Sequence, residues 1–146
     1  MDPNLHDNPP SLSLDIKHIL LLDDDPDVVS VLKDTLEARH FIVTTAINGV
    51  EGLRQVMAQD FDIILCDLMM PTMPGDMFYI AVQRTKPQLV ERFIFITGHS
   101  ENPKVAAFLH KISAPVIYKP VTSDEITQVI EKVLTEATPL VPPGSY

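Results

Sequence analysis

The sequence predicts an α/β fold in which a doubly wound, five-stranded parallel sheet is covered by helices on both faces. Short apolar runs alternate five times with segments of helical period, and the connections between them are short. Right-handed crossovers between parallel strands lay each helix against the sheet, so this alternation requires helices on both faces.

The size and composition of the chain fit one globular domain. It has 146 residues, of which 45% are hydrophobic and 21% charged. The net charge of -9, with no run of lysine or arginine, argues against direct contact with nucleic acid or an anionic membrane. No apolar run reaches the roughly 18 residues of a membrane span. With no secretory signal at its start and one cysteine, Cys66, which we interpret as a core residue, the chain is expected in the cytoplasm.

Three segments are expected along the chain. Proline, asparagine and serine without periodicity predict a flexible N-terminal lead over residues 1–14. Three further prolines predict a tail or linker over residues 137–146. The folded domain is expected over residues 15–136.

Each expected strand is a short apolar run, often with β-branched residues, that ends at a polar residue or a turn. The first run stops at three consecutive aspartates that begin at Asp23. The third ends at Asp67, before a proline-rich loop that closes with Gly75. In chain order, the strands are expected at residues 17–22, 41–46, 63–67, 92–97 and 114–118.

Each expected helix begins at a recognisable signal. Asp25 and Asn102 are both followed by proline, the arrangement of an N-cap with proline at the first helical position. Asn48 and Gly75 open two further helices, and Thr122–Glu125 has the spacing of a capping box. The helices are expected at about residues 26–39, 49–57, 76–84, 103–112 and 123–136.

Polar side chains follow four of the strands directly. In a parallel sheet the carboxyl ends of all strands meet at one edge, so these side chains are expected to be neighbours. Three carboxylates this close need a compensating charge, which Mg²⁺ with oxygen ligands supplies. An aspartate beside Mg²⁺ can attack phosphorus while a lysine neutralises the transferred oxygens, so the set fits the acceptance of a phosphoryl group. Its members are Asp23, Asp24, Asp67, Thr97 and Lys119.

Simpler interpretations exist for each of these residues. Asp67 could cap its own loop, and Thr97 and Lys119 could be an ordinary strand end and a surface lysine. The aspartates from Asp23 to Asp27 could be a solvated helix start favoured by the helix dipole. An EF-hand fits less well, because Val28 stands where glycine is required and a strand precedes the cluster.

In these residues the chain resembles receiver domains of the two-component response regulator family. The resemblance covers about residues 17–136 and implies the flavodoxin-like strand order 2-1-3-4-5. It also implies a signalling switch rather than an enzyme, with catalysis confined to the chain's own phosphorylation and dephosphorylation. The matching segments, in the family's order and spacing, are Leu22-Asp23-Asp24-Asp25, Asp67 with Pro71 and Gly75, Ile96-Thr97-Gly98, and Tyr118-Lys119-Pro120.

The resemblance also implies partners and roles. The phosphoryl donor would be a sensor histidine kinase or a histidine phosphotransfer protein, in a reaction that needs Mg²⁺. Phosphorylation would rearrange the face of the fourth helix and fifth strand. An output domain, on a longer parent chain or as a separate effector, and a homodimer both fit the family. The implied roles are phosphoacceptor for Asp67, direct metal ligands for Asp24, Asp67 and the backbone carbonyl of Met69, largely water-mediated ligand for Asp23, switch hydroxyl for Thr97 and phosphate partner for Lys119.

Two features distinguish the chain within this family. Phe or Tyr usually stands three residues before the lysine, but here that residue is Val116; Tyr118, on the same strand face, is the candidate replacement. Met69 and His99 occupy positions that tune loss of the phosphoryl group. Because an apolar Met69 cannot orient an attacking water by hydrogen bonding, we expect a long-lived phosphorylated state.

Two other functions stay open. A small aspartate-nucleophile phosphatase of the haloacid dehalogenase kind would use an Asp-x-Asp-x-Thr/Val motif. Asp23 and Asp25 supply the aspartates, but Asp27 replaces the Thr or Val, and the chain lacks the length for a substrate cap. A phosphorylation-independent interaction module is less favoured, because every site residue expected of a receiver is present.

Overall fold

The computed structural model of the chain describes residues 16–140. The predicted lead over residues 1–14 lies outside these residues, as do residues 141–146 of the predicted tail. The assignment of residues 15–136 as the folded domain stays a prediction.

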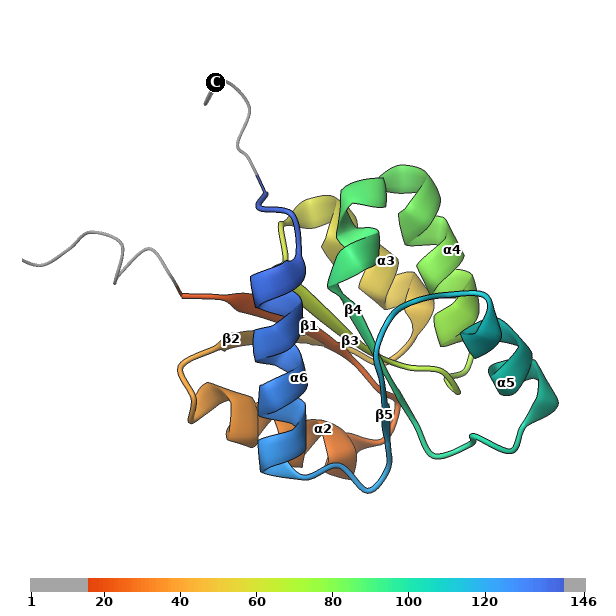
Figure 1. Cartoon of the computed structure of the whole chain (residues 1–146), viewed down its shortest axis with the longest axis horizontal. Coiled ribbons are helices and arrows are strands. Elements are labelled where there is room, and N and C mark those ends of the chain that lie inside the picture. The colour runs from red at the N-terminus through yellow and green to blue at the C-terminus, as the bar shows by residue number, and fades with distance from the viewer. Residues whose placement is uncertain (1–15, 141–146) are drawn as a thin grey trace, which may run out of the picture.

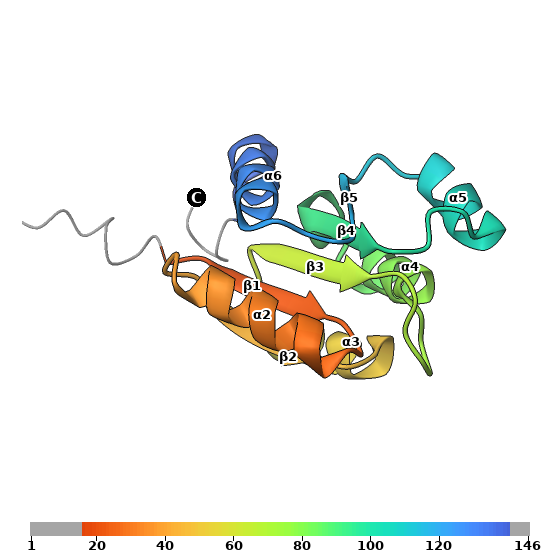
Figure 2. The same cartoon turned by 90° about the horizontal axis from the view of Figure 1, so that it is seen from below.

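The five predicted strands form one parallel sheet in the predicted order β2-β1-β3-β4-β5. In Figure 2 the arrowheads of β1, β3 and β4 point the same way. The carboxyl ends of all strands therefore lie along one edge of the sheet, which we call the carboxyl edge. The strands are β1 (His18–Leu22), β2 (Ile42–Ala46), β3 (Ile63–Asp67), β4 (Phe93–Thr97) and β5 (Val116–Tyr118).

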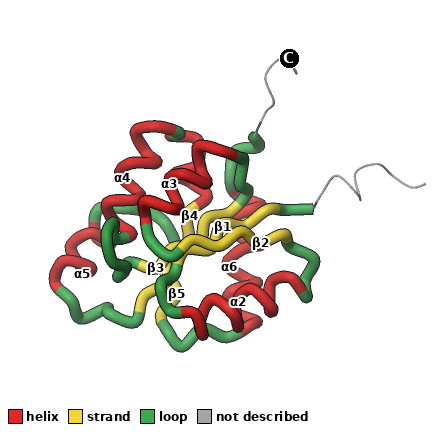
Figure 3. Tube along the Cα trace, turned by 180° about the vertical axis from the view of Figure 1, so that it is seen from behind, coloured by secondary structure: helices red, strands yellow, loops and turns green. Residues whose placement is uncertain are grey.

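Helices cover both faces of the sheet, as predicted (Figures 1 and 3). On one face lie α2 (Pro26–Glu37) and α6 (Ser123–Glu136). On the other lie α3 (Gly49–Ala58), α4 (Gly75–Thr85) and α5 (Pro103–His110). The predicted polar N-caps are confirmed, because their side-chain oxygens accept hydrogen bonds from first-turn amides. The capping residues are Asp25, Asn48, Asn102 and Thr122.

Alternation along the strands divides the core into two layers. In β1, Leu20 and Leu22 pack toward α3, α4 and α5, whereas Ile19 and Leu21 pack toward α2 and α6. All four are fully buried. Burial of each such side chain contributes about 1.5–3 kcal/mol, so the two layers fix the register of the sheet. The positions of the residues at the carboxyl edge follow from that register.

One element was missed by the sequence analysis. A 3-10 helix, η2 (Pro87–Arg92), precedes β4, so Arg92 belongs to this turn and not to the predicted strand. Arg92 is buried; its guanidinium donates to the carbonyl oxygens of Asp62 at 3.1 Å and Thr138 at 2.6 Å. The Glu91 carboxylate accepts from the amide of Thr138 at 3.1 Å. The backbone that follows α6 is therefore bonded to the start of β4.

Other element boundaries moved by one or two residues. The fifth strand begins at Val116 rather than residue 114, and α5 ends at His110 rather than residue 112. Strand pairing explains the first difference, because β5 pairs with β4 over three residues only. Among the described residues, no helix has the length and apolar character needed to cross a membrane.

Candidate functional site

The structure brings the predicted site residues together at the carboxyl edge. Asp23 follows β1, Asp67 and Thr97 are the last residues of β3 and β4, and Lys119 follows β5. Asp23, Asp67 and Thr97 are buried, at 1%, 3% and 0% exposure, and Asp24 is exposed. Residues far apart in sequence thus share one polar cluster whose only solvent-facing carboxylate is Asp24.

Local packing fixes the position of Asp67. Gly75, at the start of α4, lies against the β3–α4 loop, and a Cβ there would overlap the carbonyl oxygen of Asp67. The amide of Gly75 donates to the carbonyl oxygen of Leu68 at 3.2 Å, which closes the loop. Only glycine allows this approach, so Gly75 lets the loop pack closely against the end of β3, where Asp67 is held in register with Ile96 of β4.

Lys119 is the cation of the cluster. Its Nζ lies 3.1 Å from Oδ2 of Asp23 and 3.5 Å from Oδ2 of Asp67. The amide of Asp25 donates to Oδ1 of Asp23 at 2.9 Å, and the amide of Met69 donates to Oδ1 of Asp67 at 3.3 Å. Each buried carboxylate therefore has one amide and one ammonium partner.

These partners do not fully compensate the charge of Asp67. Burial and the negative charge of Asp23 raise the pKa of Asp67, and Lys119 and the amide of Met69 lower it; the result is a pKa of about 6, against 3.8 for a free side chain. Burial lowers the pKa of Lys119, but Asp67 and Asp23 outweigh this and raise it overall. The cluster thus carries an excess of negative charge with Lys119 held as a cation.

The donor set of the cluster fits a magnesium ion. One carboxylate oxygen each from Asp23, Asp24 and Asp67 lie within 4.8 Å of one another. Mg²⁺ prefers oxygen ligands and usually keeps several waters, and the exposed Asp24 leaves a path for them. Burial and the negative charge of Asp23 raise the pKa of Asp67, and a divalent cation at these oxygens would act in the opposite direction, because it favours the charged carboxylate.

Thr97 ends β4 beside this cluster. Its Oγ1 accepts a hydrogen bond from the amide of His99 at 2.9 Å, which leaves the hydroxyl hydrogen free to donate. A Cβ added at Gly98 would meet the Lys119 side chain at ordinary contact distances of 3.6 and 3.7 Å. A small side chain would therefore fit at this position without displacing Lys119.

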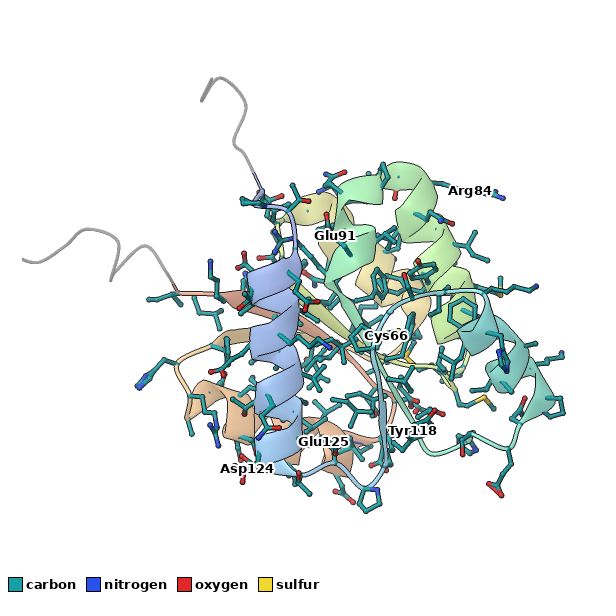
Figure 4. The ribbon with its side chains drawn as sticks, in the orientation of Figure 1. Cys66, Arg84, Glu91, Tyr118, Asp124 and Glu125 are labelled. Carbon is teal, nitrogen blue, oxygen red and sulfur yellow. The ribbon has the colours of Figure 1, made fainter. Side chains whose placement is uncertain are left out.

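The remaining positions singled out in the sequence lie around this cluster. Met69 is 39% exposed, immediately above the site. Tyr118 is 53% exposed and is paired with Thr97 in the strand register, and Val116 is partly buried on the same strand face. Cys66 lies in the interior, where burial raises the pKa of its thiol well above the usual value, and this agrees with a core role (Figure 4).

The sequence analysis did not find the amide donors of the site. The amides of Asp25, Met69 and His99 each bond a site side chain two residues earlier. Such contacts depend on loop conformation, and every residue type but proline has the amide. For Asp67 the bond is the loop-capping contact considered in the sequence analysis, because Asp and Thr side chains commonly accept from the amide two residues later.

Comparisons with known proteins address the family and the fold of the chain. The family model described as the response regulator receiver domain matches residues 19–131. The chain is 31% identical over 122 residues to the transcriptional regulatory protein GlrR of Escherichia coli K12, and this match covers 84% of the chain but only 27% of GlrR. The chain thus spans about a quarter of that relative.

Two solved structures have the same fold. The CheY-like receiver domain protein of Methanospirillum hungatei JF-1 is 27% identical with a TM-score of 0.76, and the match covers 84% of this chain and 96% of that one. The response regulator protein TrrA of Thermotoga maritima, solved in complex with Mg²⁺ and BeF, is 24% identical with a TM-score of 0.70; coverage is 81% and 99%. The fold class is thereby confirmed.

Proposed function

The chain belongs to the response regulator receiver domain family, and from this premise we propose that it is a phosphoacceptor switch in which Asp67 is phosphorylated. The observation that carries the proposal is the convergence of Asp23, Asp24 and Asp67 with Lys119 at the carboxyl edge. The buried Asp67 carboxylate lies beside the Lys119 ammonium and beside carboxylate oxygens that can bind a divalent ion. A carboxylate in such a setting is suited to attack a phosphorus atom.

In the proposed step, an Asp67 carboxylate oxygen forms the new bond to phosphorus. The bond from phosphorus to the nitrogen of a donor histidine breaks, and its electron pair stays on the imidazole. Asp24, Asp67 and the Met69 carbonyl, with Asp23 largely through water, would hold Mg²⁺, which would supply positive charge to the phosphoryl oxygens. Lys119 would pair with a phosphoryl oxygen in place of its contact with Asp67.

The product would be read out through Thr97. Its hydroxyl hydrogen can donate to a phosphoryl oxygen, and a movement of the side chain toward Asp67 would lengthen its bond from the His99 amide. Because β4 and β5 are paired at Thr97 and Tyr118, such a movement would reach the α5–β5 face. The donor would be a sensor histidine kinase or a histidine phosphotransfer protein, and a connected or separate effector would read the change.

The proposal is tested by the intact mass of the protein after incubation with acetyl phosphate. We expect a gain of one phosphoryl group with Mg²⁺ and none with a chelator. Borohydride reduction of the acyl phosphate, followed by peptide mapping, should locate it at Asp67. No gain in the folded protein would contradict the proposal and favour an interaction module. Multiple turnovers of a small phosphoester would favour the phosphatase alternative.

Loss of the phosphoryl group is expected to be slow because of Met69. Its exposed thioether side chain lies two residues after Asp67 and offers a water no strong hydrogen bond. Met69→Asn, which can orient a water, should therefore shorten the lifetime of the phosphorylated protein severalfold. Mass spectra at timed intervals after removal of acetyl phosphate measure this. The control is Met77→Asn, at a matched exposed methionine on α4, whose phosphorylated state should have the wild-type lifetime. If all three proteins lose the phosphoryl group at the same rate, Met69 is not the cause of slow loss.

We propose that the Tyr118 ring changes position when Thr97 moves, and so replaces the aromatic residue that is absent at Val116. It lies opposite Thr97 across the β4–β5 pair and is about half exposed, so its ring has space to move. Tyr118→Ala should leave phosphorylation intact but reduce the amide chemical-shift changes on α5 and β5 that phosphorylation causes. If phosphorylation causes the same chemical-shift changes on that face in Tyr118→Ala as in the wild type, Tyr118 takes no part in the response.

A further inference from the structure

Two adjoining hollows run between α4 and α5. The larger, about 470 Å³, is lined by residues of both helices and the segment after α5, and the smaller, about 290 Å³, reaches the loop after Asp67. Asp76, Lys104 and Phe108 line both, so the hollows form one continuous surface, which we call the α4–α5 groove. The two helices lie side by side in Figures 1 and 3.

The groove has a firm aromatic floor. The Phe108 ring packs edge-on against Phe95 and Tyr79, with ring centres 5.3 and 5.6 Å apart. Tyr79 and Phe95 are buried at 6% and 0% exposure, so Phe108 is held between core residues. A partner would therefore meet a preformed apolar surface and not one that must first be ordered.

Large apolar side chains are exposed along this groove. Ile80 in the larger hollow is 42% exposed, and Met69 and Met77 in the smaller are 39% and 53% exposed. Apolar side chains gathered at a hollow, rather than scattered singly, mark binding surfaces. Methionines in particular adapt to different apolar partners.

The charge of the groove is unusual for this molecule. Lys104 lines it from α5 and Lys111 from the position directly after that helix, and Asp76 is the one acidic lining residue among those described. Neither lysine forms an ion pair with another described side chain. Although the whole chain carries a charge of -9, these two lysines form a local site of attraction for an acidic group.

We propose that the α4–α5 groove docks an amphipathic helix of a partner protein, with acidic residues about two turns apart beside its apolar stripe. No described strand residue lines the groove, so an extended peptide would find no strand edge to pair with, whereas a helix satisfies its own backbone. Lys104 and Lys111 are seven residues apart, or about 10 Å along a helix axis. Acidic residues seven apart on the partner match this spacing.

A phage-displayed library tests the proposal. Its peptides share a helical alanine scaffold with a leucine stripe, and the flanking positions are randomised among Glu, Gln and Lys. Selected on the full chain, the library should yield clones with Glu at positions seven apart. Their amide chemical-shift effects on the protein should be confined to α4, α5 and the loop after Asp67. No enriched clone, enriched Lys or Gln flanks, or shifts on another face would overturn the proposal.

Charge reversal sharpens the test. Lys104→Glu with Lys111→Glu should weaken the selected clones about tenfold, the combined effect of two partly exposed ion pairs. Lys132→Glu on α6, also an exposed lysine, should leave their affinity unchanged, which separates groove contact from net charge. Equal loss for both variants would overturn the proposal. Sedimentation that shows self-association lost in the double variant would instead assign the groove to a second copy of this chain. The selection uses unphosphorylated protein, so its result does not depend on the proposed function.

Discussion

In metal-free buffer near pH 7.5, the Asp67→Asn variant is expected to be more stable than the wild type by about 1–3 kcal/mol. The reason is that the Asp67 carboxylate is buried beside Asp23, and its pKa is raised from 3.8 to about 6. Folding must therefore hold a charge in a site that disfavours it, and the neutral amide of asparagine removes that cost. Urea unfolding in the presence of a chelator measures the difference.

The pH dependence of this difference has a defined sign. Between pH 3.8 and about 6, the folded protein binds a proton at Asp67 that the unfolded chain releases. Acidification through this window therefore favours the folded wild type, and the penalty is fully present only above it. The advantage of the variant should shrink as the pH falls from about 7 to 4. Asp34→Asn, at an exposed carboxylate on α2, is the control and should show no such trend.

Magnesium should reverse the comparison. The wild type gains stability with the logarithm of the free ion concentration once this exceeds Kd, whereas the variant has lost one of the three carboxylates. A variant that is less stable than the wild type in chelator would mean that Lys119 and the Met69 amide already compensate the charge of Asp67. The argument for a missing cation would then fail.

Lys119→Met is expected to have the opposite effect, a loss of about 2–4 kcal/mol in metal-free buffer. The variant leaves the buried carboxylates of Asp23 and Asp67 without the ammonium that lies 3.1 and 3.5 Å from them. Methionine keeps most of the apolar stem of the side chain, so lost packing contributes little. Urea unfolding again measures the change, and Lys132→Met, an exposed lysine on α6, should be nearly neutral.

Added Mg²⁺ should stabilise Lys119→Met more than it stabilises the wild type. In the wild type the ion and the lysine compensate the same carboxylates, so part of the ion's effect is already present. In the variant the ion acts alone. Equal stabilisation by Mg²⁺ in both proteins would mean that the ion and Lys119 do not share Asp23 and Asp67, which would contradict the site described above.

The fold was predictable because its signals are local. Asp25 and Asn102 before proline, and the Thr122 hydroxyl, start helices through bonds within one turn, and all three act as caps in the structure. The apolar run of β1 likewise predicts a buried strand, but since all four residues from Ile19 to Leu22 are apolar, only the structure shows which of them face each layer. By contrast, the 3-10 helix η2 is stabilised by the burial of Leu89 and Arg92 and by the hydrogen bond from Arg92 to the carbonyl oxygen of Asp62. These contacts join residues far apart in sequence, so no local pattern predicts the element.

The site was predictable in membership but not in geometry. Parallel strands bring their carboxyl ends to one edge, so Asp23, Asp67, Thr97 and Lys119 had to meet there if the topology was right. That Lys119 lies closer to Asp23 than to Asp67 depends on the path of the loop after β5. The raised pKa of Asp67 depends on burial and on that pairing, and neither is written in the sequence.

Hydrogen bonds from Arg92 and to Glu91 hold the backbone of Thr138, and this decides where a label or a second protein can be attached to the chain. Thr138 is held at the strand-start side of the sheet, beside Asp62, and β1 also begins on that side. A dye, a sensor surface or a reporter protein joined after residue 140 would sit away from Asp67 and leave the carboxyl edge facing solution. Since both the amide and the carbonyl of Thr138 are bonded, the chain leaves the domain from a fixed point on the side opposite the carboxyl edge.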